Sequence, residues 1–193
     1  HYARVGEWDT GGIGPHDLRV RPDGTLVVAN GGIATDPQDR TPLNLGTMRP
    51  NLATLDGGGT ILTRHELPGA LWANSIRHLA LLEDGVAFAM QWQGDAAEPV
   101  ALLGIARGED MATCGVPEQD AFAMQGYAGS IAAAGDAIVV TSPRGGVAMI
   151  HGRDGAHRVT LRRADVCGAA AGVDGRAAFL GEGEPVAQFM QQG

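Results

Sequence analysis

The sequence predicts an all-β protein of the β-propeller class. Three observations lead to this prediction: helical periodicity is nearly absent, short apolar runs are separated by Asp-Gly or Gly-Asp pairs, and these pairs recur at intervals close to the length of one propeller blade. Asp and Gly tolerate the positive φ of tight hairpin turns, and strand-forming residues lie on both sides of each pair. Each pair is therefore predicted to join two antiparallel strands.

The spacing of the hairpins indicates a repeat. They lie at residues 21–28, 83–88, 135–140 and 173–179, and the intervals between the second residues of the pairs are 61, 51 and 39 residues. The first interval contains residues 31–50, a 20-residue stretch rich in Gly, Pro, Asp and Thr, without which it is 41 residues long. Since a propeller blade takes about 40–50 residues, this stretch is interpreted as an insert in a regular repeat.

The repeat predicts four blades in a single domain, at approximately residues 9–70, 71–125, 126–164 and 165–193. Further strands are expected at 51–56, 61–66, 100–106, 147–151, 158–161, 168–171, 176–180 and 186–190. A β-sandwich with the same number of strands is the competing all-β architecture. It gives no reason for hairpins to recur at blade intervals, which favours the propeller.

The two ends of the chain leave two interpretations open. Residues 1–8 are predicted to form an outer strand, and the fourth unit ends without one. Either the opening strand closes the fourth blade of a small ring, which avoids open sheet edges, or the blades belong to a larger propeller of about seven blades. Blade edges left open in this way also offer a surface for pairing with another copy of the chain.

Composition excludes several classes of function. All 14 basic residues among the 193 are arginine, so chemistry that needs a lysine amine is excluded. The net charge of -8 argues against nucleic acid or an anionic membrane as partner. No apolar run is long enough for a membrane span, and the motifs HExxH, GxSxG and GxGxxG are absent. No cofactor is implied.

The two cysteines, Cys114 and Cys167, have neither CxxC spacing nor a paired histidine motif, so no zinc or redox site is indicated. They are expected to be unpaired thiols, and a disulfide between them would require an oxidising compartment.

Polar residues recur at one predicted edge of the sheets. The first strand of each hairpin starts at the edge where the second strand ends, and in a propeller this edge faces the mouth of the central channel. The insert leaves from the same edge and is expected to overhang it. The candidate ligand-binding residues are His16, Asn30, Asn44, Arg49, Arg77, His78, Gln91, Ser142 and Arg144.

Arginine pairs with carboxylates and phosphates, and histidine can donate hydrogen bonds or bind a metal. A small anion or a metal chelate is therefore the expected ligand, with a partner protein as the other candidate. His16 and His78 are weak metal candidates because neither has a second ligand at metal-binding spacing. Adjacent residues on a strand point to opposite faces, so His16 and Asp17 are not expected to face one substrate together.

Several motifs in fixed order resemble the bacterial domain of unknown function 1513 family: GIGPHDLR at 12–19, VVANGGI at 27–33, LNL at 43–45, TMRP at 47–50, SIRHLA at 75–80, QWQG at 91–94 and TSPRGG at 141–146. The resemblance covers most of residues 1–181. This sequence departs from the family at Gly46, where an acidic residue is usual, and by lacking an export signal and upstream blades.

The resemblance implies an exported, propeller-like protein, often encoded near iron-uptake components and without an established enzymatic activity. The leading hypothesis is accordingly a periplasmic or exported binding propeller, with its ligand or partner at the predicted rim. The alternatives are a metal-dependent enzyme or metal carrier that uses His16 and His78, and a structural scaffold in which the polar residues only join neighbouring blades.

Overall fold

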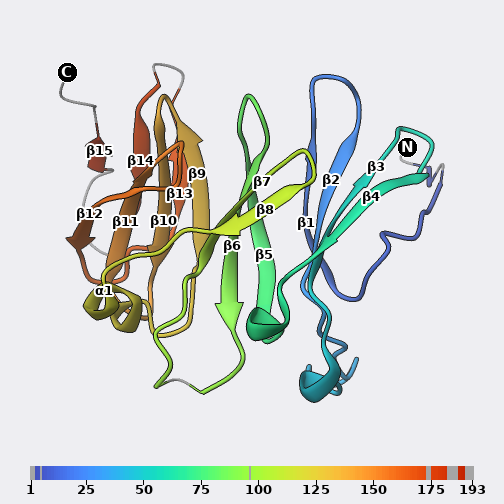
Figure 1. Ribbon diagram of the computed structural model, residues 1–193, viewed down its shortest axis with the longest axis horizontal. Helices are drawn as coiled ribbons and strands as arrows, with labels where there is room; N and C mark the ends of the chain where they lie inside the picture. Colours follow the sequence, from blue (N-terminus) through green and yellow to red (C-terminus); the bar gives the residue numbers. More distant parts are fainter. Residues whose placement is uncertain (1–2, 5, 96, 173–174, 182–186, 190–193) are drawn as a thin grey trace.

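The computed structural model describes residues 3–4, 6–95, 97–172, 175–181 and 187–189, and within these residues the chain forms four separate antiparallel sheets (Figure 1). We call the sheets blades 1 to 4. Blade 1 consists of β1 (Pro15–Val20), β2 (Leu26–Asn30), β3 (Asn51–Leu55) and β4 (Ile61–Glu66). Blade 2 consists of β5 (Asn74–Leu81), β6 (Val86–Trp92), β7 (Leu103–Arg107) and β8 (Asp110–Thr113).

Blade 3 consists of β9 (Ser130–Ala134), β10 (Ala137–Ser142), β11 (Val147–Gly152) and β12 (His157–Arg162). Blade 4 has three described strands, β13 (Ala169–Ala171), β14 (Ala177–Phe179) and β15 (Ala187–Phe189). Three short helices lie in the connections: η1 (Leu45–Thr47), η2 (Gly69–Leu71) and α1 (Glu118–Ala123). No helix in the described part of the chain is long and apolar enough to cross a membrane.

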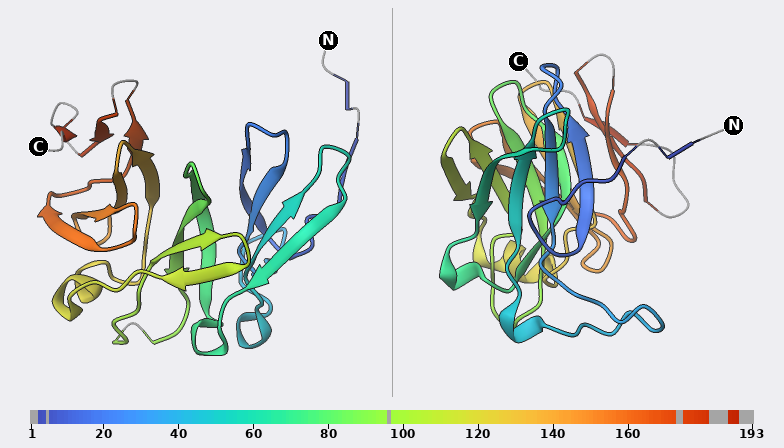
Figure 2. Two further views of the ribbon diagram at one scale, coloured as in Figure 1. Left: turned by 45° about the horizontal axis from the view of Figure 1, so that its top comes forward. Right: turned by 90° about the vertical axis from the view of Figure 1, so that its right-hand side faces the viewer.

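The blades are arranged around their first strands. Within each sheet the strands follow chain order, and β5 packs between β1 and β9, while β9 also packs against β13. Figure 2 shows the four sheets fanning out from these first strands in an open arc. The first strand of each blade is therefore the innermost, as in a propeller. This arrangement confirms the all-β propeller prediction, and separate sheets in an arc are not a sandwich.

The turns between the first and second strands of the blades lie at the predicted hairpins. The turn between β1 and β2 is closed by a 2.8 Å hydrogen bond from Arg21 N to Thr25 O, and Gly24 adopts a φ of 84° within it. Gly135, between β9 and β10, has a φ of 56°. Positive φ is the backbone state that glycine adopts without strain, so these positions explain the sequence signal. Asp174 of the fourth hairpin, and Val186 and Met190 of the predicted last strand, lie outside the described residues.

The ends of the chain do not follow the closed-ring interpretation. Blades 1 and 4 lie at opposite ends of the arc (Figure 2). Residues 3–4 and 6–8, the described part of the predicted opening strand, are not in a strand. Trp8 instead packs on the turn between β3 and β4, where a Cβ on Gly59 would overlap its ring.

Two elements of the structure were not predicted. Strand β8 completes blade 2, and α1 lies between blades 2 and 3. Strand β8 has only four residues, Asp110–Thr113, and most of them are exposed, so it has no apolar pattern. Helix α1 begins after Pro117 and has Glu118 and Asp120 in its first turn. Both features are helix-start signals, but six residues are too few to show helical periodicity.

The core consists of apolar layers between neighbouring blades. Val27 and Leu52 of blade 1 pack with Ile76, Leu79 and Phe88 of blade 2, and similar layers join blades 2 and 3 and blades 3 and 4. Full burial of each such side chain contributes about 1.5–3 kcal/mol, so the interfaces between blades hold the arc together.

The outer face of blade 1 differs from these interfaces. Leu18 and Val20 of β1 are on the face turned away from blade 2, and they are 46% and 59% exposed. This face remains uncovered within the described residues.

Candidate functional site

The innermost strands of blades 1 and 2, β1 and β5, each have an irregular pairing register near their start. The pairing of β1 with β2 shifts between Pro15 and Asp17, and that of β5 with β6 shifts between Ile76 and His78. His16 and Arg77 are thus the extra residues of two equivalent β-bulges. A bulge interrupts the alternation of side chains along a strand and redirects the bulged residue.

The first bulge changes the expectation for His16 and Asp17. His16 Nδ1 lies 3.0 Å from the carbonyl oxygen of Arg77, and Asp17 Oδ2 accepts a 2.9 Å hydrogen bond from Leu79 N. Both side chains therefore face β5. The expectation of opposite faces was wrong because strict alternation holds only for regular strands.

The two histidines of this edge are in contact. Their rings are edge to face, with centroids 4.9 Å apart and an interplanar angle of 87°. Burial is the largest cause lowering the pKa of both His16 and His78, and the positive charge of Arg77 lowers both further. The pair is therefore neutral at pH 7, and each neutral ring offers one N–H donor and one lone pair.

Tyr127, just before β9, interacts with two arginines, one by stacking and one by electrostatics alone. The guanidinium of Arg144 stacks over the Tyr127 ring, 4.2 Å from its centroid. Burial lowers the pKa of Arg77 and Tyr127 opposes this shift, so the Tyr127 side chain is within electrostatic reach of Arg77. Among the described residues neither arginine forms an ion pair, and Arg77 Nε is buried without a hydrogen-bond partner. We call His16, Arg77, His78, Tyr127 and Arg144 the inner-strand site.

Two of the predicted site residues are instead internal. Asn30 is fully buried, and its side chain binds Thr10 and, at 3.0 Å, Asn51. Ser142 is also fully buried, and its hydroxyl donates a 2.8 Å hydrogen bond to the carbonyl oxygen of Met124. These contacts hold together segments that precede and connect the blades.

The remaining predicted residues lie at the margin of the inner-strand site. Asn44 binds Ala34 N and Gly32 O within the insert, and Arg49 is 3.7 Å from Glu66 at the end of the outermost strand β4. Gln91 Nε2 donates a weak 3.5 Å hydrogen bond to Ala128 O. The structure thus brings together His16, Arg77, His78 and Arg144, and it places the other five predicted residues in internal or peripheral contacts.

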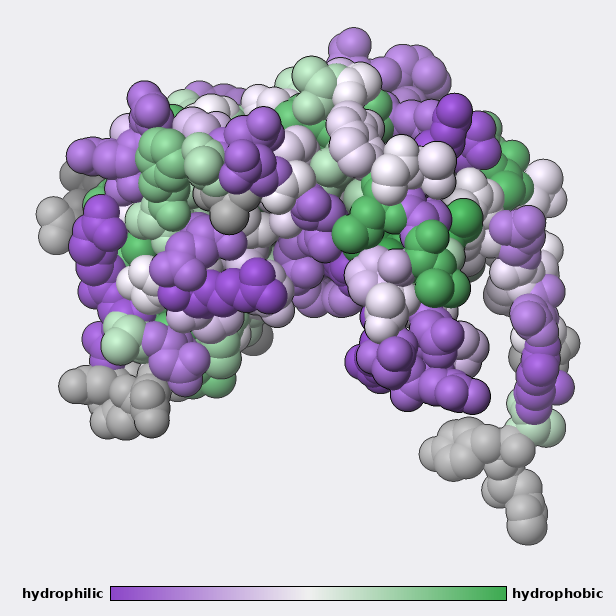
Figure 3. Space-filling model, turned by 90° about the horizontal axis from the view of Figure 1, so that it is seen from below, coloured by the Kyte–Doolittle hydropathy of each residue, from purple (hydrophilic) through white to green (hydrophobic). Residues whose placement is uncertain are grey.

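The insert, residues 31–50, lies as predicted at the end of the sheets where β1 begins (Figure 1). Helix η1 is near the C-terminal end of the insert. Figure 3 shows the molecule from this end. Hydrophilic and hydrophobic residues alternate over its surface, and the molecule is hollowed between the two ends of the arc.

Two residues that make contacts in this region, Tyr127 and Asp17, were not among the predicted site residues. Tyr127 lies under Arg144, and an aromatic residue at the start of an inner strand was the available signal. Asp17 binds the Leu79 amide, but nothing in the sequence indicates a contact across 62 positions. Both thiols are free, with Cys114 buried and Cys167 exposed. Within the described residues, no group of three or more His, Cys, Asp or Glu side chains is arranged to hold a metal ion.

The fold and the inner-strand edge define a propeller-like protein. The whole chain, residues 1–193, matches the family described as protein of unknown function (DUF1513). The chain therefore belongs to the DUF1513 family. No curated protein sequence matches it.

Solved structures show the same architecture at low sequence identity. Kuenenia stuttgartiensis hydrazine synthase is 12% identical with a TM-score of 0.61, over 91% of this chain and 58% of that chain. A catalytically inactive virginiamycin B lyase from Staphylococcus aureus with quinupristin is 14% identical with a TM-score of 0.56, over 92% of this chain and 70% of that chain. A streptogramin B lyase is 14% identical with a TM-score of 0.52, over 92% of this chain and 69% of that chain. These similarities concern the fold alone.

The buried histidine of blade 3, His151, makes folding stability sensitive to acid. Burial lowers its pKa below the ordinary value of 6.5, so the unfolded chain takes up a proton more readily than the folded protein. The stabilisation is complete above about pH 6.5 and is lost as pH falls below it toward the lowered pKa.

We expect the destabilisation caused by His151→Gln, measured by urea unfolding, to shrink between pH 8 and pH 5.5. Ile138→Val, at the position paired with His151, changes no titrating group. It should lower the free energy of unfolding by the same amount at pH 8 and pH 5.5. An equal cost of His151→Gln at both pH values would contradict the prediction.

Proposed function

We propose that the protein is a binding propeller of the cell envelope, and that the inner-strand site holds a small anion or an anionic metal chelate. One observation supports this most directly: two arginines without ion pairs lie at the edge where the innermost strands begin, Arg144 stacked on Tyr127 and Arg77 within electrostatic reach of the same side chain. Most arginines elsewhere in the described chain have a carboxylate partner, as Arg107 has in Asp84 and Arg158 has in Asp136. An external anion would supply the missing partner.

The electrostatics of the site support the same ligand class. Arg77 is half-buried, so a charge-assisted hydrogen bond to it is screened less than one at the surface. The neutral His78 adds an N–H donor without adding charge, and the Tyr127 hydroxyl is a further donor, whereas His16 already donates its Nδ1–H to the Arg77 carbonyl. The site therefore combines two positive charges with two neutral donor groups, on a protein whose net charge is -8.

The envelope location and a link to iron uptake rest on the family resemblance. An anionic ferric chelate fits the charge of the site, whereas a free metal ion would find only the two imidazoles of His16 and His78 among the five residues of the inner-strand site. The chelate is therefore the form of iron that the inner-strand site favours.

Calorimetric titration with citrate, inorganic phosphate and ferric citrate tests the proposal. We expect at least one of these anions to bind, and Arg77→Ala and Arg144→Ala each to weaken binding at least tenfold, about 1.4 kcal/mol. Arg21→Ala is the matched control, because Arg21 also has no ion pair in the described chain but lies at the opposite end of β1.

Two outcomes would contradict the proposal. One is that none of the three anions binds to the unmodified protein. The other is that Arg21→Ala weakens binding as much as Arg77→Ala, which would indicate nonspecific attraction by surface charge. A fall in melting temperature in Arg77→Ala with unchanged anion binding would favour the scaffold alternative instead.

A further inference from the structure

A second group of side chains meets at the interface between blades 2 and 3. Cys114, Met124, Met149 and His151 all line one small buried cavity of about 10 Å³. The other residues around it are apolar: Val100, Leu102, Leu103, Val116, Ala121 and Val140. A cavity of about 10–15 Å³ holds roughly one water-sized sphere, so this one has room for a single atom or ion. A small cavity lined by three sulfur-containing residues and one imidazole has the donor types of a soft-metal site.

Three separate elements bring these side chains together. Cys114 directly follows β8, and Met124 is the C-terminal cap of α1. Met149 and His151 are alternate residues of β11, whose pairing with β10 is regular, so both point to the same face. The hydrogen bond from the Ser142 hydroxyl fixes the backbone at Met124. The ends of blade 2, the connecting helix and blade 3 thus all contribute to the cavity.

The orientation of His151 leaves one ring nitrogen available. Its side chain is 1% exposed, and Nδ1 lies 3.1 Å from the carbonyl oxygen of Gly155. Because a carbonyl can only accept, Nδ1 carries the hydrogen and Nε2 keeps its lone pair. A backbone carbonyl bound to the other ring nitrogen is the usual support of a metal-binding histidine.

We propose that Cys114, Met124, Met149 and His151 bind one soft monovalent metal ion, with Cu(I) as the biological candidate. Thioether and thiolate sulfur select Cu(I) among the common metals, and imidazole completes such sites. Zinc sites in proteins are built from Cys, His, Asp and Glu, and two of the four residues here are methionines. The site is separate from the inner-strand site and does not depend on the proposed function.

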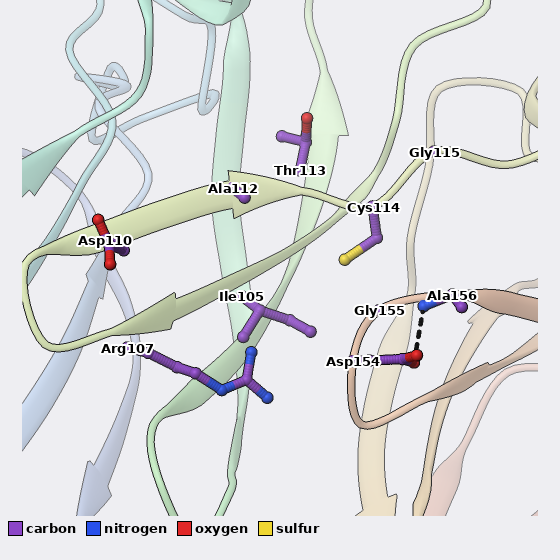
Figure 4. Close-up of a pocket in the computed structure, with 10 residues that line it drawn as sticks. All are labelled: Ile105, Arg107, Asp110, Ala112, Thr113, Cys114, Gly115, Asp154, Gly155 and Ala156. Carbon is purple, nitrogen blue, oxygen red and sulfur yellow. Dashed lines mark hydrogen bonds between the residues drawn. The ribbon is translucent and has the colours of Figure 1, made fainter.

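One residue of the cavity also borders the molecular surface. Cys114 also lines an open groove of about 380 Å³ between β8 and the turn at Asp154 (Figure 4). Its sulfur lies beside that turn, because a Cβ on Gly155 would be 2.6 Å from Sγ. Cys114 therefore borders both the groove and the cavity.

Burial raises the pKa of the Cys114 thiol to about 11, so the thiol is protonated before the metal arrives. Binding forms a Cu–S bond and releases the thiol proton to the buffer, and no electron is transferred.

The test uses the intact chain under reducing, anaerobic conditions, with Cu(I) supplied from a chelator of known affinity. We expect one tightly bound Cu(I) per chain, with sulfur and nitrogen neighbours in its X-ray absorption spectrum. Met124→Leu and Met149→Leu should each weaken retention at least tenfold, and Cys114→Ser and His151→Gln should abolish it. Because Met→Leu conserves volume and costs little stability, the methionine variants remain informative even if the other two fail to fold.

Two controls make the result specific to this cavity. Cys167→Ser removes the exposed thiol, and Met90→Leu changes a fully buried methionine in the layer between blades 1 and 2. Both variants should retain Cu(I) like the unmodified protein. The proposal is overturned if less than one Cu(I) is retained, if Cys167→Ser removes it, or if the two cavity methionines can be replaced without loss of affinity.

Discussion

Replacing Phe88 with alanine should destabilise the folded protein by about 3–5 kcal/mol, the range for removing a fully buried aromatic ring. Phe88 is fully buried in the apolar layer between blades 1 and 2 and lies opposite Gly104 on the neighbouring strand. An ideal Cβ on Gly104 would overlap the Phe88 ring, so the ring covers the glycine. Urea unfolding followed by circular dichroism measures the loss, which is large against the total stability of about 5–15 kcal/mol of most proteins.

The contact between Phe88 and Gly104 provides an internal control. Gly104→Ala alone should cost about 1–3 kcal/mol through overpacking, but it should be nearly neutral when Phe88 is already alanine. If Gly104→Ala costs the same in both backgrounds, within about 0.5 kcal/mol, the ring does not occupy the space above Gly104 and the account of this layer is wrong.

The sequence predicts the repeat because the turn that marks each blade is a local feature of the chain. An Asp-Gly or Gly-Asp turn needs only its own backbone conformation, so Gly24 and Gly135 could be placed without knowledge of the rest of the fold. Strand β8 and helix α1 were missed for the opposite reason. They are short and depend on neighbouring elements for their stability, and they show no periodicity of their own.

The candidate site was predicted in part. The edge where inner strands begin follows from antiparallel pairing, and the structure has His16 against His78 and Arg144 over Tyr127 near this edge. The burial of Asn30 and Ser142 could not be predicted, because it depends on contacts with Thr10 and Met124 that no strand pattern encodes.

The pair His151 and His157 illustrates the same limit. Its position around a Gly-containing turn suggests a solvated hairpin, yet His151 is almost completely buried and only His157 is partly exposed. The packing of blade 3 on blade 2 decides this difference, and it involves residues far apart in the chain. Chemistry built from such contacts, including the cavity at Cys114, is visible only in the structure.

Asp17→Ala should destabilise the protein by about 3 kcal/mol, because it removes the acceptor that joins blade 1 to blade 2. The carboxylate accepts hydrogen bonds from Leu79 N at 2.9 Å and from Leu18 N at 2.8 Å, and it forms a 2.6 Å ion pair with Arg19. Leu79 is a buried residue, and a buried donor left without a partner costs about 1–3 kcal/mol, more when the lost partner is charged.

Asp23→Ala is the matched control for this prediction. Asp23 also accepts bonds from a backbone amide and a side chain, both of Thr25, but it lies in an exposed turn. Water can replace its contacts there, so the variant should lower the free energy of unfolding much less than Asp17→Ala does. Asp17→Asn keeps one acceptor oxygen and should fall between the two. Equal unfolding free energies for Asp17→Ala and Asp23→Ala would show that apolar packing alone holds blade 1 on blade 2, and that the carboxylate of Asp17 contributes no more than a surface turn.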